Sequence, residues 1–570
     1  MIHLKSCQIS WNDEHLDVPL GKKTFLEDCY LDFTREERNN GVRYQLQIHP
    51  KVNLKMNAIK AHFSFSYPKD AQVFCNGFQS WTSSRNYGIQ ESIPKLRKIA
   101  RPFFKYYGDE NNELLKEKNG QLLHSWSYGY VSSKKNINFI GSLNEKTGFT
   151  IINYTPEINQ ITAEIDCKGL ELQHSFPILD IWVASGKEKS VLERYFSEMN
   201  TKVAPPKVTG WTSWYQHFTN INEKLILDNL NEFEAQEIQL DFFQIDDGYQ
   251  KNVGDWLDVD QEKFPNGMGQ ISRSIRKAGF QPGIWIAPFV CSKNSLIFKN
   301  QPSWILKDKK GKPIKVGYNP MWGGWYYALD FYHAKFQEYL IGVFHSLTQN
   351  WNFDLVKIDF LFAACIAPPP NRTAGQVMND AMTFIRTQVG DKKIIGCGVP
   401  LGSAFGMVDY CRIGADIHLE WEHKLLNFLR KRERVSCRAA MRSIFSRWSL
   451  DGLAFGNDPD VVLLRSEGNK LSSKQKQSIL RVNALLGSLV FTSDNPKQWT
   501  EEEREDFVSI KSLQKAKVQE VNQLGIDVYE IIFIDNDVQK TAWFNLTKKK
   551  MKMNNQHEQI DLAPFESIIF

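Results

Sequence analysis

The sequence contains no paired cysteine motif. Its nine cysteines are spread singly over 570 residues, with no Cys-x-x-Cys spacing and an odd total. This pattern supplies neither a disulfide framework nor the ligand set of a zinc ribbon. We therefore expect reduced thiols and a cytoplasmic protein.

Long apolar runs and an excess of one charge are also missing. No stretch approaches the roughly 18 uninterrupted apolar residues of a membrane helix, and the first residues, MIHLKSCQISWN, do not resemble a secretion signal. Lys and Arg number 70 against 65 Asp and Glu, which leaves a formal charge of +5 without a long basic stripe. We expect neither a membrane nor a nucleic acid as partner.

The chain divides into three regions with different patterns of apolar residues and turn signals. Up to residue 203, short apolar stretches alternate with turn signals such as Asn40-Gly41 and Asn76-Gly77, which predicts an N-terminal β-sandwich domain over residues 1–203. Short strand-like stretches return near the end and predict a small C-terminal antiparallel β domain over residues 517–570.

Between residues 204 and 516, strand-like and helix-like segments alternate. The strand candidates are KVTGWTSW, LDFFQID, QPGIWIAPF, FDLVKIDF, KKIIGCG, DYCRIGA, GLAFGND and SLVFTSD. Such alternation predicts βαβ units and a parallel sheet. Eight units of this size match a closed (β/α)8 (TIM) barrel, although periodicity alone also permits an open doubly wound sheet. The expected fold is thus multidomain, α/β and all-β, with a central barrel.

Carboxylates follow several of these strand candidates. Asp246-Asp247, Asp359 and Asp416 come after the second, fourth and sixth strands. Each could simply cap a helix, but strand ends of this kind converge on the catalytic face of a barrel. Glycoside hydrolysis needs two carboxyl groups around the anomeric carbon, and Asp359 and Asp416 can face each other from different strands. Lys357 points to the same side as Asp359 and would hold it ionised.

The adjacent Asp246 and Asp247 require donors nearby. Vicinal sugar hydroxyls would supply them, as would a metal ion. The aspartates that follow, at positions 255, 258 and 260, lack the glycine and the terminal glutamate of a calcium loop. We therefore expect no metal.

Several ordered segments resemble a known family. TGWTSWYQHF, FFQIDDGYQKNVGDWL, PGIWIAPF, VKIDFLFA, GCGVPLG, RIGADI and NDPDVVLLR resemble the motifs of glycoside hydrolase family 36 α-galactosidases, and NGFQSW resembles a motif of that family's β domain. The resemblance covers nearly the whole chain. It implies a retaining enzyme that removes terminal α-linked galactose from raffinose- or melibiose-type oligosaccharides without a cofactor. The oligomeric state is left open.

The resemblance also implies residue roles. Asp359 matches the nucleophile, Asp416 the acid/base, and Asp246 and Asp247 the carboxylates that hold the 4- and 6-hydroxyls of galactose. The other side chains expected to contact the sugar are Lys357, Arg412, Trp285, Cys397, Tyr215 and Trp256. Either Phe78 or Trp81, in NGFQSW, is expected to reach over from the β domain.

Three other functions compete with this interpretation. A transglycosylase of the raffinose- or stachyose-synthase type would use the same covalent intermediate, and an α-N-acetylgalactosaminidase would need extra room near Cys397. A silent sugar-binding protein is disfavoured, because both Asp359 and Asp416 are present. A retaining mechanism predicts carboxyl groups about 5 to 5.5 Å apart, against roughly 6.5 to 9.5 Å for inversion.

Overall fold

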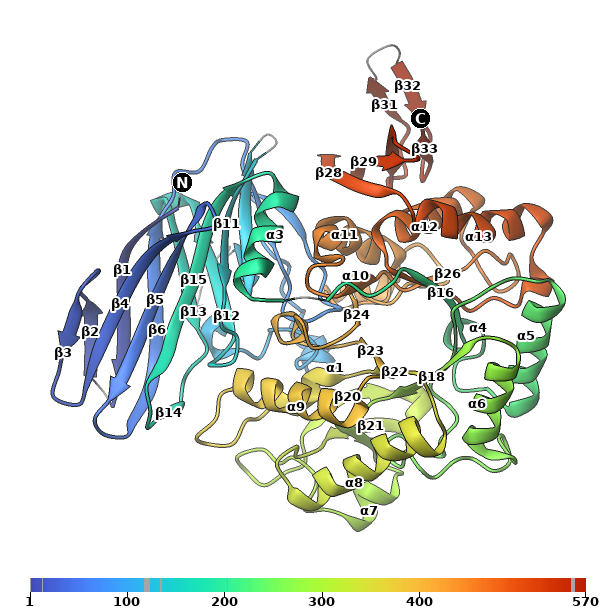
Figure 1. Cartoon of the computed structure of the whole chain (residues 1–570), viewed down its shortest axis with the longest axis horizontal. Helices are drawn as coiled ribbons and strands as arrows, with labels where there is room; N and C mark the ends of the chain where they lie inside the picture. Colours follow the sequence, from blue (N-terminus) through green and yellow to red (C-terminus); the bar gives the residue numbers. More distant parts are fainter. Residues whose placement is uncertain (1, 13, 117–122, 134–135, 202, 555–558) are drawn as a thin grey trace.

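The computed structural model describes residues 2–12, 14–116, 123–133, 136–201, 203–554 and 559–570. Two large antiparallel sheets come first, a curled parallel sheet follows, and small antiparallel sheets end the chain (Figure 1). The first sheet has the order β2-β1-β6-β13-β12-β9, with β14 beside β6. The second has the order β3-β4-β5-β15-β11-β10-β7-β8.

The strands of these two sheets are short to medium in length. Those of the first sheet are β1 (His3–Trp11), β2 (Glu14–Val18), β6 (Leu54–Ser64), β9 (Leu123–Trp126), β12 (Thr150–Thr155), β13 (Gln160–Ile165) and β14 (Glu171–Leu172). Those of the second are β3 (Lys23–Phe25), β4 (Cys29–Arg38), β5 (Gly41–Pro50), β7 (Gln72–Cys75), β8 (Arg85–Gly88), β10 (Tyr128–Ser133), β11 (Asn136–Ser142) and β15 (Phe176–Gly186).

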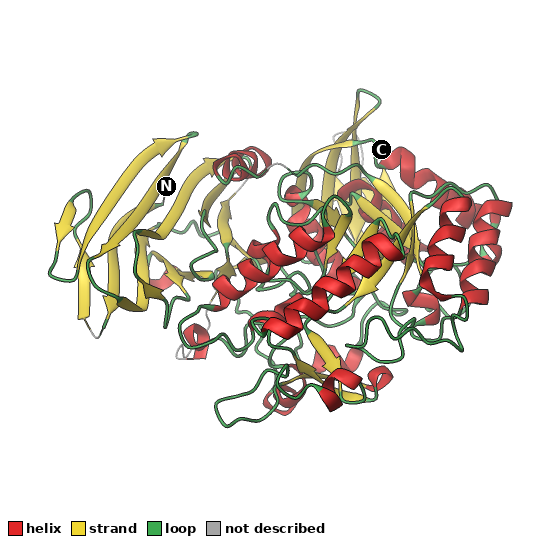
Figure 2. Cartoon of the chain, turned by 60° about the horizontal axis from the view of Figure 1, so that its bottom comes forward, coloured by secondary structure: helices red, strands yellow, loops and turns green. Residues whose placement is uncertain are grey.

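The two sheets pack as layers around an apolar core. In β5 the alternate residues Tyr44, Leu46 and Ile48 are buried, as expected of a strand with one face on the core. Leu46 and Ile48 of β5 and Phe63 of β6 belong to the same buried cluster. Figure 2 shows the layers beside the helix-rich part of the molecule.

The two predicted Asn-Gly turns differ from expectation. The hairpin between β4 and β5 turns at Asn39 and Asn40, which have φ of 50° and 51°, because Arg38 pairs with Gly41. The turn therefore lies one residue before the predicted one. Asn76 does not form a two-residue turn; it begins a longer loop between β7 and β8, with its side chain buried and bonded to the Trp126 carbonyl.

Nine strands form the parallel sheet, in the order β25-β24-β23-β22-β18-β17-β16-β27-β26. They are β16 (Val208–Thr212), β17 (Phe242–Ile245), β18 (Gln281–Ile286), β22 (Leu355–Ile358), β23 (Lys393–Gly396), β24 (Tyr410–Arg412), β25 (Gly456–Asp458), β26 (Val461–Val462) and β27 (Leu489–Thr492). Only Pro459 and Asp460 separate the two edge strands, β25 and β26, so the edges of the curled sheet are neighbours in the chain. All eight strand candidates from the sequence contain a strand of this sheet.

Helices surround the outer side of the parallel sheet (Figure 2). The longer ones are α5 (Glu223–Ala235), α6 (Gly267–Lys277), α8 (Ala334–His345), α9 (Ala374–Val389), α11 (Cys437–Arg447), α12 (Ser473–Leu486) and α13 (Glu501–Leu513). Met268, Ile271 and Ile275 of α6 are buried, at the spacing of one helical face. Three strands, β19 (Val290–Ser292), β20 (Lys315–Asn319) and β21 (Gly324–Ala328), form a separate small sheet after β18.

The alternation of strand and helix breaks between β23 and β24. A short 3-10 turn, Leu401–Ala404, stands where the predicted pattern requires a helix. The NGFQSW loop (residues 76–81) covers this place instead: Leu401 N donates to the Phe78 carbonyl at 3.1 Å, and Ser80 N donates to the Val399 carbonyl at 2.9 Å. The N-terminal sheets therefore supply the cover that a barrel helix would give.

The C-terminal sheets are small. One contains β28 (Lys517–Gly525), β29 (Val528–Asp535), β30 (Val538–Asn545) and β33 (Ser567–Ile569), and the other contains β31 (Met551–Asn554) and β32 (Gln559–Leu562). Arg438 and Arg442 of α11 form ion pairs with Asp527 and so attach the larger sheet to the middle of the chain.

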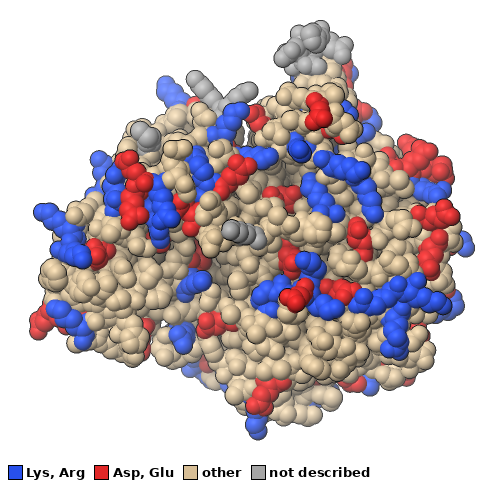
Figure 3. Space-filling model, viewed as in Figure 1, with Lys and Arg blue, Asp and Glu red and all other residues tan. Residues whose placement is uncertain are grey.

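The visible surface carries mixed charges. Figure 3 shows Lys and Arg interspersed with Asp and Glu over this face. Within the described part of the chain, no helix combines the length and the apolar character needed to cross a membrane.

Candidate active site

Carboxylates meet where the parallel strands end. Asp246 and Asp247 follow β17, Asp359 follows β22, and Asp416 follows β24 in the RIGAD loop (residues 412–416). Besides burial, the charges of Asp416 and Asp246 raise the pKa of Asp359, which places the three side chains in one electrostatic neighbourhood. The Asp247 amide donates to Asp246 Oδ1 at 2.9 Å, so the fourth aspartate predicted from the sequence lies beside the other three.

Lys357 forms a buried ion pair with Asp246. Its Nζ lies 2.9 Å from Asp246 Oδ2, and both side chains are almost completely buried. Burial disfavours the ammonium, but the charges around it, that of Asp246 foremost and that of Asp359 among them, together raise the pKa of Lys357 above its usual range. Gln244 also donates to Asp246 Oδ2, at 2.8 Å. The direct partner of Lys357 is therefore Asp246, and its effect on Asp359 is electrostatic.

Asp359 is held by two donors. Trp285 Nε1 on β18 donates to its Oδ2 at 3.0 Å, and the Phe360 amide donates to its Oδ1 at 2.9 Å. Burial raises the pKa of Asp359 to about 6, although Lys357 and Trp285 act in the opposite direction. At neutral pH the carboxylate is therefore ionised, desolvated and fixed in orientation.

Asp247 lies beside Asp246 and has its own donors. Trp322 Nε1 donates to Oδ2 at 2.7 Å, and Gln250 Nε2 donates to Oδ1 at 2.6 Å. Burial raises the pKa of Asp247 to about 6, against the effect of these two donors. Its oxygens retain further lone pairs for hydroxyl donors.

Arg412 links Asp416 to two carboxylates that we did not predict as site residues from the sequence. Its guanidinium contacts Asp416 at 2.6 Å, Asp458 at 3.1 Å and Asp460 at 2.9 Å. Asp416 keeps 35% of its side chain exposed, whereas Asp458 and Asp460 are buried. Burial raises the pKa of Asp460 despite the facing guanidinium. The NDPD motif was one of the segments that resemble family 36, but its pairing with Arg412 could not be inferred from the sequence.

Three other predicted residues border this cluster. Cys397 directly follows β23 and is buried, and burial raises the pKa of its thiol well above the usual range. Tyr215 is buried and its hydroxyl donates to Asp460. Trp256 is fully buried, with its ring 5.6 Å from that of Trp285 in an edge-on arrangement. Contact of these side chains with a sugar stays a prediction.

The structure distinguishes Trp81 from Phe78. The Trp81 ring lies 5.1 Å from that of Phe360, the residue after Asp359. The Phe78 ring packs instead on Trp126 and Phe149 within the N-terminal sheets. Trp81 is therefore the side chain of this loop that packs on the residue next to Asp359.

Tyr107 and Lys431 are neighbours for which local sequence gave no signal. The Tyr107 hydroxyl bonds that of Tyr326, and burial raises its pKa together with the charges of Asp359 and Asp416. Lys431 Nζ lies 4.1 Å from the centre of the Tyr107 ring. Burial lowers the pKa of Lys431 to about 8.

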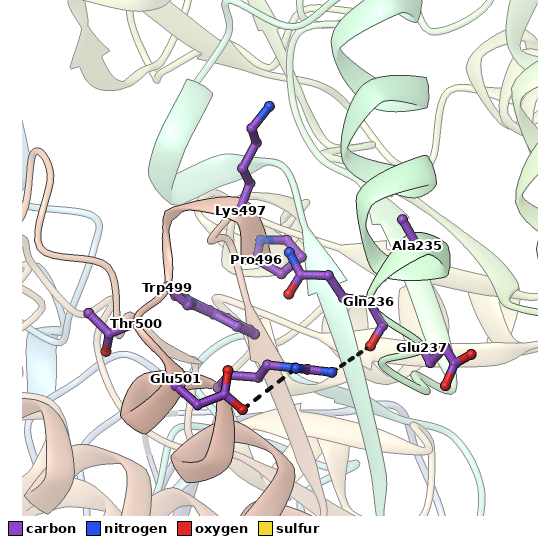
Figure 4. A pocket seen from close by; sticks show the side chains of 9 residues that line it. Ala235, Gln236, Glu237, Pro496, Lys497, Trp499, Thr500 and Glu501 are labelled. Carbon is purple, nitrogen blue, oxygen red and sulfur yellow. Dashed lines mark hydrogen bonds and ion pairs between the residues drawn. The ribbon is translucent and has the colours of Figure 1, made fainter.

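A separate cavity lies outside this cluster. It has a volume of about 400 Å³ and is bordered by the end of α5 and the start of α13 (Figure 4). Its Arg504 contacts Glu501 at 3.6 Å and donates to the Gln236 carbonyl at 3.0 Å. None of the candidate carboxylates lines it. No cluster of three or more His, Cys, Asp or Glu suited to a metal ion occurs among the residues that the structure describes.

Comparisons with known proteins identify α-galactosidases as similar in sequence and in fold. Residues 188–382 match the melibiase family model. Mel36A, an α-galactosidase of Lactobacillus acidophilus, is 24% identical over 221 residues, which cover 37% of this chain and 29% of that protein. The α-galactosidase TtGalA of Thermus thermophilus, in complex with p-nitrophenyl α-D-galactopyranoside, superposes with a TM-score of 0.72 at 24% identity over 91% of this chain and 98% of that one. Its complex with stachyose gives 0.70 at 25% identity, over 86% and 99%.

The chain thus resembles the melibiase family and α-galactosidases in sequence, and glycoside hydrolase family 36 α-galactosidases in fold. The resemblance seen in the sequence motifs is thereby confirmed. The matched segments span less than a third of the length of the first curated relatives. The structural likeness, by contrast, extends over most of this chain and shows that the arrangement of sheets is shared.

Proposed function

We propose that this protein is a retaining α-galactosidase that removes terminal α-linked galactose from oligosaccharides of the raffinose and melibiose type. The observation that carries the proposal is the pair of carboxylates Asp359 and Asp416, which follow β22 and β24 on the same side of the parallel sheet, with Asp416 held by Arg412. The motifs around both residues match those of family 36, and the relatives named above are α-galactosidases.

In the first step Asp359 acts as the nucleophile. One of its carboxylate oxygens attacks the anomeric carbon while the bond to the leaving oxygen breaks, and Asp416 gives that oxygen a proton. Trp285 and the Phe360 amide orient the attacking carboxylate. The product of this step is a galactosyl ester of Asp359.

In the second step water replaces the leaving sugar. Asp416, now a carboxylate, takes a proton from water, whose oxygen attacks the anomeric carbon and expels Asp359. The partial exposure of Asp416 allows water to reach it. Arg412, fixed by Asp458 and Asp460, holds Asp416 in place through both steps.

Recognition of galactose is assigned to the neighbouring carboxylates. Asp246 and Asp247 would accept hydrogen bonds from the 4- and 6-hydroxyls. Lys357, which is paired with Asp246, and Arg412, which is paired with Asp416, would contact further hydroxyls. Trp285, Tyr215, Trp256 and Cys397 would shape the remaining boundary. Because two carboxylates and water complete the cycle, the proposal needs no cofactor.

The proposal includes the architecture that carries the site. We assign residues 1–203 to a β-sandwich, 204–516 to a closed (β/α)8 barrel and 517–570 to a C-terminal β domain. The chain continuity of β25 and β26 supports closure of the barrel. The nine cysteines are unpaired and buried, which supports a reducing, cytoplasmic environment.

Hydrolysis of paired substrates tests this function. The purified protein should release nitrophenol from nitrophenyl α-galactoside much faster than from the α-glucoside or the α-N-acetylgalactosaminide. Nuclear magnetic resonance of the first product formed should show the α-anomer of galactose. Preference for the N-acetylated substrate would replace the proposal by α-N-acetylgalactosaminidase. Oligosaccharide rather than free galactose from raffinose would replace it by transglycosylation, and an initial β-anomer would contradict retention.

A further inference from the structure

Arg447 is a completely buried arginine whose partners are all uncharged. It is the last residue of α11 and has no exposed surface. Among the described residues, its five N–H donors meet five neutral oxygens, and none of these hydrogen bonds goes to a carboxylate. The acceptors are Asn76 Oδ1 at 3.0 Å and the carbonyls of Ser80 at 2.7 Å, Ile413 at 3.0 Å, and Gly77 and Gln79 at 3.4 Å.

Such an arrangement is costly. A buried ion without a counter-ion loses its hydration, and only well-placed hydrogen bonds compensate. Burial lowers the pKa of Arg447 to about 10, which still leaves the guanidinium charged at neutral pH. A side chain needed only to fill space here could be apolar, so the guanidinium is placed to organise its acceptors.

The acceptors belong to two loops that meet at the carboxylate cluster. Four of the five are in the NGFQSW loop, and the fifth, Ile413, is in the RIGAD loop between Arg412 and Asp416. Nη1 bridges the loops directly, because it donates to both Ser80 and Ile413. A single planar group thus links the N-terminal sheets to the end of β24.

The NGFQSW loop ends at Trp81, which packs on Phe360 beside Asp359. Gly398 also lies close to both Trp81 and Phe360. Gly398 has φ of +57°, and a Cβ at this position would lie 3.0 Å from the Trp81 ring and 3.2 Å from the Phe360 backbone. A small displacement of residues 76–81 would therefore disturb the packing next to Asp359.

We propose that Arg447 is a positioning residue that fixes Trp81 against Phe360 by fastening the NGFQSW loop to the RIGAD loop. The effect on turnover rests on the proposed function of Asp359 and Asp416. The effect on the order of the loop does not, which allows the two ideas to be tested separately.

Arg447→Lys is the principal variant. Lysine keeps a positive charge but offers three donors from one point, and it cannot reach five acceptors in a plane. Arg442→Lys is the matched control, because Arg442 is on the same helix and links α11 to Asp527 in the C-terminal sheet. Asn76→Ala, which removes the acceptor of Nε, serves as a second variant if Arg447→Lys does not fold.

Turnover of nitrophenyl α-galactoside gives the first readout. We expect Arg447→Lys to lower kcat/KM by about 10- to 100-fold, since misplacement by about 1 Å has effects of this size. Arg442→Lys should stay within about twofold of the unmodified protein. When Trp81 is already Ala, Arg447→Lys should cause less than about a twofold further loss, because both changes act through the same ring. An equal loss with and without Trp81 overturns the proposal.

Amide hydrogen exchange gives the second readout. Arg447→Lys and Asn76→Ala should speed exchange in the peptide that contains residues 76–84, and Arg442→Lys should not. Unchanged exchange in this peptide overturns the role of Arg447 whatever the activity. If the unmodified protein hydrolyses no α-galactoside, the proposed function fails, and the exchange measurement still decides the role of Arg447.

Discussion

Lys357 and Asp246 form an ion pair across the parallel sheet, with 2.9 Å between Nζ and Oδ2. Lys357 is on β22 and Asp246 follows β17, so the contact passes over the end of the intervening strand β18. Removal of one partner of a buried pair leaves an uncompensated charge, which typically costs about 3 to 5 kcal/mol. We expect Lys357→Met to lower the free energy of unfolding by this amount and Asp246→Asn to restore part of it in the double variant.

Urea denaturation measures this effect. Lys392→Met is the control, because Lys392 pairs with Asp354 near the surface, where loss of a pair costs less than about 1 kcal/mol. If Lys357→Met were no more destabilising than Lys392→Met, the buried pair would contribute little to the fold.

Activity should fall on the acid side of about pH 6. Asp359 must be ionised to attack, and burial raises its pKa to about 6. Lys357 opposes this rise, so its replacement by Met should move the acid limb of the kcat/KM profile to higher pH. The profile of kcat/KM against pH measures the free protein. An acid limb below pH 5, or one that Lys357→Met moves downward, would contradict this account.

The raised pKa of Asp359 also makes the stability of the folded protein depend on pH in a defined direction. Burial raises the pKa of Asp359 from its ordinary value of 3.8 to about 6 in the folded protein, so the folded state binds more protons between these values. The contribution of Asp359 to stability is therefore largest below about pH 4 and declines as the pH rises to 6. Asp359→Asn should remove this part of the pH dependence, as thermal unfolding at pH 4.5 and 7 would show. Equal pH dependence in both proteins would argue against the raised pKa.

Asp247→Asn should reduce turnover without unfolding the protein. The amide keeps the shape of the side chain but loses the charge that two hydroxyls of galactose would meet. Hydrogen bonds to charged groups contribute about 1.5 to 3 kcal/mol each, so we expect kcat/KM to fall by at least about tenfold. Asp380→Asn, at the partner of the Tyr332 hydroxyl outside the cluster, is the control. Unchanged turnover by a folded Asp247→Asn protein would remove Asp247 from sugar recognition.

Local sequence was sufficient for the strands and for the main carboxylates. The segment LVKI of β22 is buried at every position, and a run that is apolar except for Lys357 predicts a strand covered on both faces. Asp359 follows it directly, where strand ends meet. Asp246 and Asp416 were found by the same rule, which needs no knowledge of distant residues.

Contacts between distant segments could not be found in this way. The pairing of Arg412 with Asp460 depends on how β24 and β26 are placed in the curled sheet. The NGFQSW loop takes the place of the helix that the alternating pattern predicts between β23 and β24. This depends on how the N-terminal sheets dock, and no local pattern at residues 401–404 predicts it. The choice between Phe78 and Trp81 could not be made from the sequence for the same reason. Both side chains are aromatic, and only the docking of the N-terminal sheets decides which ring reaches Phe360.

Asp416→Ala should separate the two catalytic carboxylates. Asp359→Ala is expected to abolish cleavage of every α-galactoside, because no substrate supplies the missing nucleophile. General acid catalysis increases the rate roughly 10² to 10⁴-fold, and it matters most when the leaving group is poor, as is the hydroxyl oxygen of a sugar. A nitrophenolate needs little protonation. Asp416→Ala should therefore lose most activity on raffinose or melibiose, yet still form the galactosyl ester of Asp359 from nitrophenyl α-galactoside.

That intermediate should then accumulate, because water lacks its base. Azide needs no base, and it attacks the anomeric carbon from the face opposite Asp359. The first displacement places galactose on Asp359 in the β configuration, so the second, by azide, should yield α-galactosyl azide. A burst of nitrophenol followed by azide-dependent turnover is the expected kinetic result, with Glu422→Ala in the loop after Asp416 as the control that shows neither. The β-azide would instead indicate a single direct displacement without an ester of Asp359, and equal slowing of both substrates without rescue would remove Asp416 from the acid/base role.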